Sequence, residues 1–344
     1  MEFQNILIIQ TAFAGDVILT LPILEAIKEK FADTKISFLC IPNTASILLN
    51  NPFIDEVIIY DKKGSQKGIL QFRKFLNIIK SKNFDLIISP HRSLRSTMIS
   101  YFSKVKDTIS FDTSAFSSKY KTTVVYKKNV HEIVRNFSLL APLGIVRNEI
   151  IPPKLFTLER DIYVVDKLLS EFKIGEDEKF VTIAPGSVWF TKAYPEIKFA
   201  KMISLLNEFN VKIVLVGGED DIGLCAMIKV LCRNSKVCNA AGKLTYLQSA
   251  DLIRRSKVLV TNDSAPLHLA NAVDTKVIAV FGATIPEFGF YPYGKNDYIF
   301  QVNGLKCRPC GIHGGNRCPI KTFECMNKID ETDIALEVMK SVTS

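Results

Sequence analysis

The fold is indicated most directly by residues 261–284, which have the sequence TNDSAPLHLANAVDTKVIAVFGAT. This stretch contains a polar turn, a two-turn helix and a buried strand at Val277–Val280, and it follows an apolar strand at Lys257–Val260. Ser264 stands where it can cap the helix. Open α/β sheets bind ligands where polar residues end a strand beside a helix N-terminus, because the first helical N–H groups can bind phosphate. The stretch therefore predicts a site for a nucleotide-type ligand.

The rest of the chain repeats this alternation of apolar strands and amphipathic helices. Helices are expected after the loop Thr11–Gly15, running through Lys30, and at Glu132–Leu143. In the first half, strands are expected at Ile6–Gln10, Lys35–Cys40, Glu56–Tyr60, Asp85–Ser89 and Thr122–Tyr126. In the second half, the other strands are expected at Phe180–Ala184, Val211–Val216 and Asp297–Val302. Such alternation is typical of parallel, doubly wound sheets, so the predicted fold class is α/β.

The chain length favours two domains, because 344 residues exceed what one ordinary core organises. A proline-bearing linker at Ile150–Pro153 separates the two halves. We therefore expect one Rossmann-like domain at 1–155, a second at 156–328, and a final helix at 329–344 that packs back on the first domain. Two such sheets joined by a linker leave a central cleft for ligands.

Positive charge is concentrated in the first half. The chain carries a formal charge of +9, and residues 60–130 hold fifteen Lys or Arg against four Asp or Glu. Such a segment favours an anionic partner, such as a phosphorylated lipid, a membrane surface or nucleic acid, although a solvated basic surface is the alternative. The start of the chain lacks the features of a signal peptide, and no apolar run is long enough to span a membrane. We expect a cytoplasmic protein that touches a membrane face.

The first candidate site is the loop Thr11–Asp16 after the first strand. Small residues and Gly15 permit a close approach of ligand to backbone. Asp16 falls in the first helical turn, where a carboxylate can act as a general base toward a hydroxyl nucleophile. The alternative is an acidic residue that only interacts favourably with the helix dipole. The loop lacks the G-x-G-x-x-G pattern of dinucleotide-binding folds.

The second candidate site is the loop that follows Phe180–Ala184. Gly186, Ser187 and Thr191 suit contact with phosphate, and Lys192 supplies a cation ahead of a helix. The alternative is that Lys192 is an ordinary surface lysine.

Two further loops carry acidic residues at strand ends. Glu219 follows a glycine pair and can accept hydrogen bonds from ribose hydroxyls, although a plain turn explains it equally. Asp263 suits sugar hydroxyls, and Ser264 and Ala265 suit phosphate. His268 lies one turn inside the helix, where a structural role is the more common one.

The C-terminal region contains a cluster of cysteines with the spacing C-x2-C-x7-C-x6-C, formed by Cys307, Cys310, Cys318 and Cys325. The first pair has a spacing that suits a structural zinc site, whereas the others do not follow a common zinc-finger spacing. Free thiols that pack a loop, or an oxidation-prone pair, are the alternative.

Three segments together resemble the ADP-heptose:lipopolysaccharide heptosyltransferases of glycosyltransferase family 9. They are ILIIQTAFAGDVILTLPILEAIKEKF, APGSVWFTKAYP and the stretch 261–284, and the cysteine-rich tail looks like that of the heptosyltransferase II branch. The resemblance implies a GT-B fold and inverting, metal-independent transfer of heptose from ADP-L-glycero-D-manno-heptose to the inner core of lipopolysaccharide. It also implies that no cofactor is needed.

The resemblance also implies roles for individual residues. Asp16 matches the general base, and Arg92 and Arg95 are expected to bind the anionic acceptor. The residues expected to bind the donor are Ser187, Thr191, Lys192, Glu219, Asp263, Ser264, Ala265 and His268. Ala265 stands where the family commonly has Gly, and Ala193 stands where it often has Arg or His.

The implied partners are the nucleotide sugar, the lipopolysaccharide core and, peripherally, the inner membrane, without nucleic acid. One alternative is a transferase or epimerase for another nucleotide sugar on the same scaffold. The other is a zinc-bearing nucleic-acid-binding protein, which would use the basic segment and the cysteines but leave Asp16, Lys192 and Asp263 unexplained.

Overall fold

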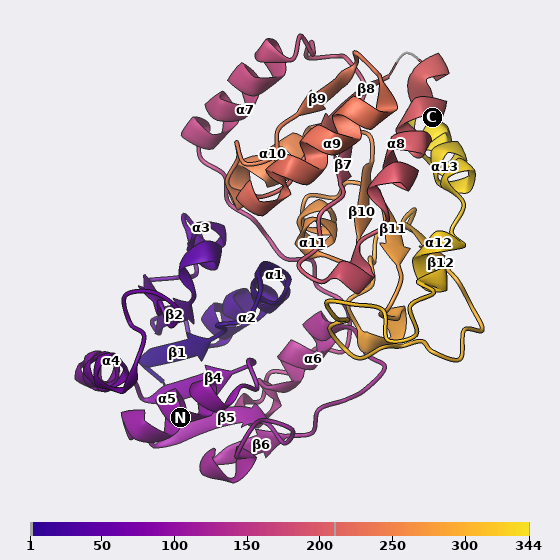
Figure 1. Cartoon of the computed structure of the whole chain (residues 1–344). Coiled ribbons are helices and arrows are strands. Elements are labelled where there is room, and N and C mark those ends of the chain that lie inside the picture. The colour runs from indigo at the N-terminus through magenta and orange to yellow at the C-terminus, as the bar shows by residue number, and fades with distance from the viewer. Residues whose placement is uncertain (1–2, 210, 344) are drawn as a thin grey trace. The chain divides into compact units, whose positions relative to one another are not determined.

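The chain forms two compact units in a computed structural model that describes residues 3–209 and 211–343. Unit 1 is Met1–Phe156 and unit 2 is Thr157–Ser344, so the division falls one residue from the position predicted from the sequence. Each unit contains a six-stranded parallel sheet flanked by helices (Figure 1). The predicted α/β class is confirmed.

Unit 1 alternates strands and helices along its length. Its strands are β1 (Asn5–Ile9), β2 (Lys35–Cys40), β3 (Glu56–Ile59), β4 (Leu86–Ser89), β5 (Asp107–Phe111) and β6 (Thr122–Val124). Its α-helices are α1 (Ala14–Thr20), α2 (Pro22–Lys30), α3 (Ala45–Leu48), α4 (Ile69–Ser81), α5 (Leu94–Ser103) and α6 (Glu132–Ser138). Its short 3-10 helices are η1 (Pro42–Thr44), η2 (Ser117–Lys119) and η3 (Ala141–Leu143).

Unit 2 repeats the same alternation. Its strands are β7 (Phe180–Ala184), β8 (Lys212–Leu215), β9 (Val237–Asn239), β10 (Leu259–Asn262), β11 (Val277–Phe281) and β12 (Tyr298–Gln301). Its α-helices are α7 (Glu159–Glu171), α8 (Glu196–Leu205), α9 (Ile222–Cys232), α10 (Tyr246–Arg255), α11 (Ala265–Ala272), α12 (Glu324–Asn327) and α13 (Glu331–Thr343). Its 3-10 helices are η4 (Phe190–Lys192), η5 (Leu206–Phe209), η6 (Glu219–Asp221) and η7 (Pro286–Phe288).

The two sheets have the same strand order. The order is β3-β2-β1-β4-β5-β6 in unit 1 and β12-β11-β10-β7-β8-β9 in unit 2. In each sheet the chain reverses its direction of winding between two central strands, which are β1 and β4 in unit 1 and β7 and β10 in unit 2. At such a switch point the loops after the two strands diverge and leave room for a ligand. The fold therefore predicts one candidate site at each of these positions.

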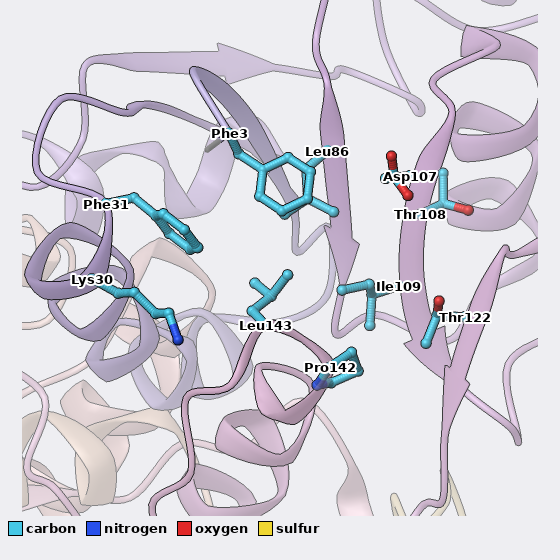
Figure 2. Close-up of a pocket in the computed structure, with 10 residues that line it drawn as sticks. All are labelled: Phe3, Lys30, Phe31, Leu86, Asp107, Thr108, Ile109, Thr122, Pro142 and Leu143. Atoms are coloured by element: carbon cyan, nitrogen blue, oxygen red, sulfur yellow. The ribbon is translucent and has the colours of Figure 1, made fainter. Parts of the chain in front are cut away.

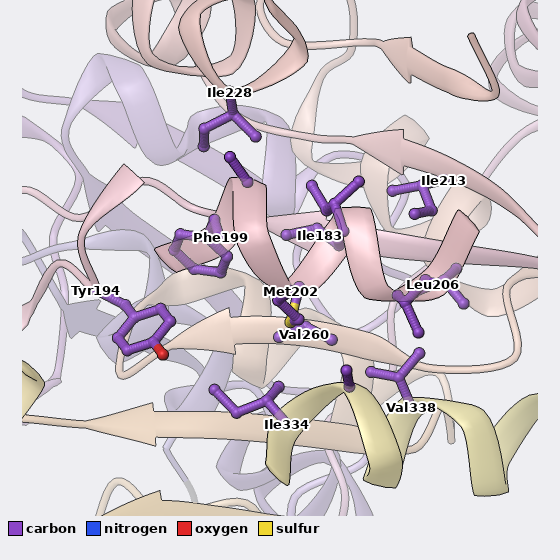
Figure 3. Close-up of a cluster of buried hydrophobic side chains, with 14 of the residues drawn as sticks. Ile183, Tyr194, Phe199, Met202, Leu206, Ile213, Ile228, Val260, Ile334 and Val338 are labelled. Atoms are coloured by element: carbon purple, nitrogen blue, oxygen red, sulfur yellow. The ribbon is translucent and has the colours of Figure 1, made fainter. Parts of the chain in front are cut away.

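Helix α13 packs within unit 2, where the sequence had predicted that it packs back on the first domain. Its apolar residues Ile334, Ala335 and Val338 belong to a buried cluster that also includes residues of α8 and the sheet (Figure 3). Its outer residues pair with the same unit, since Lys198 Nζ lies 2.6 Å from Glu331 Oε2. The prediction was wrong because an apolar helix face does not by itself specify which sheet covers it.

Prolines divide two helices that the sequence pattern had suggested were continuous. The first predicted helix, which was expected to run through Lys30, is interrupted at Leu21, and Pro22 opens α2. The helix expected at Glu132–Leu143 ends at Ser138, before the short turn that contains Pro142. Proline lacks the N–H that an interior helical position requires, and it is tolerated at the first position.

Helix α5 was not predicted from the sequence, and its packing explains why. The side that faces the sheet carries small polar residues, because Ser96, Thr97, Ser100 and Ser103 are buried beside Ile99. Their hydroxyls are satisfied locally, as when Ser100 Oγ donates to Ser96 O at 3.0 Å. A helix with a polar buried side does not show the usual apolar periodicity. The short strands β5 and β9 were missed as well.

Candidate functional site

In unit 1, Asp16 lies at the switch point between β1 and β4. It is half-buried in the first turn of α1, whose N-cap Phe13 provides no capping side chain. The loop before it is tied to the loop after β4, because Thr11 Oγ1 and His91 Nδ1 are 2.9 Å apart. A carboxylate in this position suits general-base chemistry, as predicted from its place after the first strand.

Basic side chains gather beside the loop that precedes Asp16. Lys62 Nζ donates to Thr11 O at 3.1 Å, and Arg95 Nη1 donates to Tyr60 Oη at 3.1 Å. Burial and the neighbouring cations Arg95 and Lys63 lower the pKa of Lys62. Lys62 was counted in the basic segment but not predicted as a site residue. The cations repel one another here, so an anion that binds among them would relieve that repulsion.

Helix α6 places a buried ion pair in electrostatic reach of Asp16. Arg135 Nη1 pairs with Glu132 Oε2, and both residues are buried. Burial raises the pKa of Glu132 to about 7, against the opposing charge of Arg135, and the negative charge of Asp16 raises it further. Arg92 and Arg135 lie over the Tyr126 ring, with 4.0 and 4.4 Å from guanidinium carbon to ring centroid.

This arrangement links the predicted acceptor residue Arg92 to the surroundings of Asp16. Arg92 lowers the pKa of Glu132, whereas Asp16 raises it, so both charges act on the same carboxyl group. The contributions of Glu132 and Arg135 were not predicted. Their only sequence signal is their spacing of three residues, which places them on one side of a helix.

In unit 2, the structure brings two predicted residues into direct contact. Lys192 Nζ lies 2.7 Å from Asp263 Oδ2, and Thr284 Oγ1 donates to the same oxygen at 2.6 Å. Lys192 ends η4, whereas Asp263 follows β10, so the pair bridges the two loops of the switch point. An ammonium in this position can bind a diphosphate, and the carboxylate fixes its position.

Asn262 was not predicted as a site residue, yet it holds the same two loops together. Its Nδ2 donates to Pro185 O at 2.8 Å, and its Oδ1 accepts from Tyr194 N at 2.9 Å. A side-chain amide both donates and accepts, so it can bind both ends of one loop.

The other predicted residues of the β7 loop take part in its internal contacts. Thr191 is 2% exposed, and its hydroxyl accepts a hydrogen bond from Gly315 N at 2.8 Å. Ser187 Oγ accepts from Trp189 N at 3.3 Å. A Cβ added to Gly314 would lie 3.1 Å from Lys192 Cγ, so this glycine packs tightly against the lysine stem. Contact of Thr191 and Ser187 with a donor stays a prediction.

The N-terminus of α11 differs in detail from the prediction. Ser264 occupies the N-cap position, but its side chain makes no capping hydrogen bond and instead donates to Asn262 O at 3.4 Å. The predicted capping role was therefore wrong. Ala265 opens the helix, and His268 is buried with its ring 6.3 Å from that of Phe290. Phosphate binding by this helix start stays a prediction.

Glu219 is exposed at the carboxyl end of β8, where ribose recognition was predicted. Its neighbour Asp221 was missed, although it links two loops. Asp221 Oδ2 accepts from Gly218 N at 2.9 Å, and a Cβ on Gly186 would lie against the Asp221 carboxylate. A side chain at 186 would displace that carboxylate, so the glycines of these loops were the available signal.

The cysteine-rich segment braces unit 2 but forms no metal-ligand set. No group of three or more His, Cys, Asp or Glu among the described residues is placed to hold a metal ion, so the zinc alternative finds no ligand set there. Instead, Cys310 N donates to Ala283 O at 2.9 Å, and Arg308 Nη2 donates to Thr284 O at 2.6 Å. Residues 307–315 thereby contact both Thr191 and the end of β11.

A pocket of about 350 Å³ in unit 1 lies away from these residues (Figure 2). Its lining includes Leu86, Asp107 and Thr122, which are the first residues of β4, β5 and β6. Asp16 follows the opposite end of the parallel strands. Since α/β sheets bind ligands at the carboxyl ends, this pocket is not part of the candidate site. Within the described ranges, the helices include none with the length and apolar character that crossing a membrane requires.

Comparisons with known proteins give the same fold and a family. The family model described as Glycosyltransferase family 9 (heptosyltransferase) matches residues 72–315. Lipopolysaccharide heptosyltransferase 3 of Escherichia coli is 29% identical over 310 residues, which cover 86% of this chain and 88% of that protein.

Two solved structures extend the similarity over nearly the whole chain. A family 9 glycosyl transferase from Veillonella parvula has a TM-score of 0.87 at 20% identity, covering 100% of this chain and 98% of that one. E. coli heptosyltransferase WaaC with ADP-2-deoxy-2-fluoro heptose has a TM-score of 0.71 at 17% identity, covering 98% and 99%. The predicted GT-B fold is confirmed.

Proposed function

Because the chain belongs to glycosyltransferase family 9, the heptosyltransferase family, we propose that it transfers heptose from ADP-L-glycero-D-manno-heptose to a sugar of the lipopolysaccharide inner core. The chain is thus a glycosyltransferase. The observation that carries the proposal is the Lys192–Asp263 pair at the switch point of unit 2, 2.7 Å apart and bridged to Thr284. The names of the relatives support this donor and this acceptor.

The proposed reaction is a single displacement. Asp16 accepts the proton of an acceptor hydroxyl as the hydroxyl oxygen attacks the anomeric carbon. The bond from that carbon to the diphosphate oxygen breaks, its electron pair leaves with ADP, and the configuration inverts. Lys192 stabilises the negative charge that develops on the diphosphate, with help from the N–H groups at the start of α11.

Charge placement in each unit is consistent with this division of roles. In unit 1, Lys62 binds the loop that precedes Asp16, and Arg92 and Asp16 both act on the carboxyl group of Glu132. These cations and Arg95 suit an acceptor with acidic sugars or phosphates. Unit 2 presents Lys192 held by a carboxylate, which suits a diphosphate. Glu219 is proposed to bind ribose hydroxyls. The proposed transfer needs no divalent ion, since Lys192 and the helix start supply the required positive charge.

The test is a donor panel with product mass analysis. ADP-heptose, ADP-glucose and UDP-N-acetylglucosamine are each incubated with an inner-core acceptor, with and without excess EDTA. The expected result is a mass gain of one heptose and ADP release from ADP-heptose, unchanged by EDTA, with inversion seen by NMR. Transfer from another donor alone would refute the heptose assignment. Loss of transfer with EDTA and recovery on adding back metal would refute metal independence.

A second candidate donor follows from Ala265. Its methyl group stands at the first residue of α11, where the resemblance leads us to expect glycine, and it narrows the approach of a diphosphate to the helix start. The second candidate is therefore another nucleotide sugar, such as ADP-glucose or UDP-N-acetylglucosamine, and the same donor panel decides between it and ADP-heptose.

A further inference from the structure

The outer side of α5 is apolar, although it faces solvent. Leu94, Tyr101 and Phe102 are 49%, 49% and 44% exposed, and they recur at i, i+7 and i+8, which places them on one side of the helix. The buried side carries serine and threonine. The helix therefore presents its larger apolar side chains outward, the reverse of an ordinary surface helix.

The neighbouring helix α4 adds a second exposed stripe. Its buried side packs on the core of unit 1 through Phe72, Phe75, Leu76 and Ile79. On the opposite side, Leu70, Lys74 and Ile78 follow one another at intervals of four residues and are all exposed. Helices α4 and α5 pack together, and α5 also contacts η2, which follows the exposed Phe116. We call these exposed residues of α4, α5 and Phe116 the α4–α5 face.

Cations surround the apolar residues of this face. The exposed basic residues within α4 and just after α5 are Arg73, Lys74, Lys80, Lys104 and Lys106. Lys74 lies within the α4 stripe, Lys106 follows α5, and Lys119 Nζ lies 5.0 Å from the centroid of the Tyr101 ring. A surface that combines exposed apolar side chains with a strong positive charge matches a lipid surface that offers anionic headgroups above acyl chains.

We propose that the α4–α5 face docks unit 1 on the surface of an anionic lipid bilayer. The apolar side chains enter the region between headgroups and acyl chains, and the surrounding cations bind the headgroups. The proposal deepens the proposed function, on which it rests for its biological purpose, because a lipid-anchored acceptor would be presented at that surface. A second copy of the chain is a poorer occupant, since a symmetric pairing would bring two strongly positive surfaces together.

Flotation with lipid vesicles tests the proposal directly. The full chain is mixed with vesicles of phosphatidylcholine alone, or of phosphatidylcholine with phosphatidylglycerol, and bound protein is measured after density centrifugation. Wild type should bind the anionic vesicles and lose binding as salt is raised. Leu94→Ser with Phe102→Ser should reduce the partition coefficient tenfold or more. Lys74→Gln with Lys106→Gln should reduce it about 25-fold, at roughly fivefold for each cation near the surface.

A matched control comes from α9 in unit 2, where Lys229 and Val230 are also exposed. Lys229→Gln with Val230→Ser should leave vesicle binding unchanged. Equal loss in this control, no binding by wild type, or unchanged binding by both α4–α5 variants would overturn the proposal. It would also be overturned if wild type were a dimer by sedimentation equilibrium and the α4–α5 variants were monomers.

A further measurement separates this proposal from the proposed function. Transfer to a core oligosaccharide freed of its lipid should be equal in wild type and in both α4–α5 variants, because these residues are outside the catalytic and binding sites. If no protein transfers heptose but the variants still lose vesicle binding, the proposed function fails and the docking surface stands. If transfer to the free oligosaccharide falls in the variants, the face belongs to the acceptor site and the membrane proposal fails.

Discussion

Removing the ammonium of Lys192 should affect stability and catalysis separately. In Lys192→Met the Asp263 carboxylate loses a cation at 2.7 Å, and the two side chains are only 15% and 8% exposed. Breaking a buried pair by removing one partner costs about 3–5 kcal/mol. Thr284 Oγ1 still donates to Asp263, and Lys192 is partly solvated, so we expect a loss of about 2–3 kcal/mol in the free energy of unfolding.

The catalytic loss should be of a different size and origin. If Lys192 stabilises the leaving diphosphate, its removal should lower kcat by about 10²–10³, as is typical when one preorganised group that stabilises transition-state charge is lost. The double variant Lys192→Met with Asp263→Asn leaves no uncompensated charge, so it should regain most of the lost stability. It should stay as inactive as the single variant.

Urea unfolding and steady-state ADP release on wild type, Lys192→Met, Asp263→Asn and the double variant form a double-mutant cycle. The result that would refute the reasoning is recovery of activity together with stability in the double variant. That outcome would mean that Lys192 acts only by holding Asp263. If Lys192→Met were as stable as wild type, this would contradict the claim that removing the ammonium leaves the Asp263 carboxylate buried without a compensating charge.

Three further predictions concern other parts of the chain. Asp16→Asn should lower transfer by about 10²–10⁴ while calorimetry still shows donor binding, and transfer at the wild-type rate would exclude Asp16 as the base. Gly186→Ala should destabilise unit 2 in urea unfolding, because its Cβ would displace the Asp221 carboxylate that accepts from Gly218 N, and an unchanged midpoint would contradict this contact. Burial raises the pKa of Glu132 from 4.5 to about 7. Between these two pH values the folded state holds a proton on Glu132 that the unfolded state has released. The contribution of Glu132 to the free energy of unfolding therefore falls as the pH rises through this window. The unfolding free energy of wild type should therefore fall relative to that of Glu132→Gln across this window, by about 3 kcal/mol in the limit of the full shift, and a constant difference would contradict the raised pKa.

The fold was predictable where the buried residues of an element are apolar. Apolar runs such as Phe180–Ala184 and Val277–Phe281 became strands because central parallel strands are covered on both sides. Helix α5 was missed because its buried side carries mainly serine and threonine, so the sequence does not show the apolar residues at helical spacing that predict a helix. The placement of α13 was wrong because a sequence specifies that an apolar helix face is buried, but not against which sheet.

The site was predictable to the level of loops rather than contacts. Lys192 and Asp263 were identified because each follows a strand of the same sheet, and the structure joins them directly. Asn262 and Thr284 were not identified, since a hydrogen bond between residues tens of positions apart leaves no local pattern. Asp221 was missed although its partner Gly218 is only three residues away and glycines mark the loops that it contacts. The side chain of Ser264 was expected to cap α11, yet it bonds backward to its own strand.

The contacts of residues 307–315 limit how the loop after β7, which we propose binds the donor, can be exchanged. Thr191 exchanges two hydrogen bonds with Gly315, at 2.8 and 3.0 Å, and Gly314 packs on the Lys192 stem. A chimera that receives only the loop at 186–192 from another transferase would therefore keep residues 307–315 that do not match the new loop. We expect such grafts to succeed when residues 186–192 and 307–315 are exchanged as a pair, so these two stretches form one module for engineering.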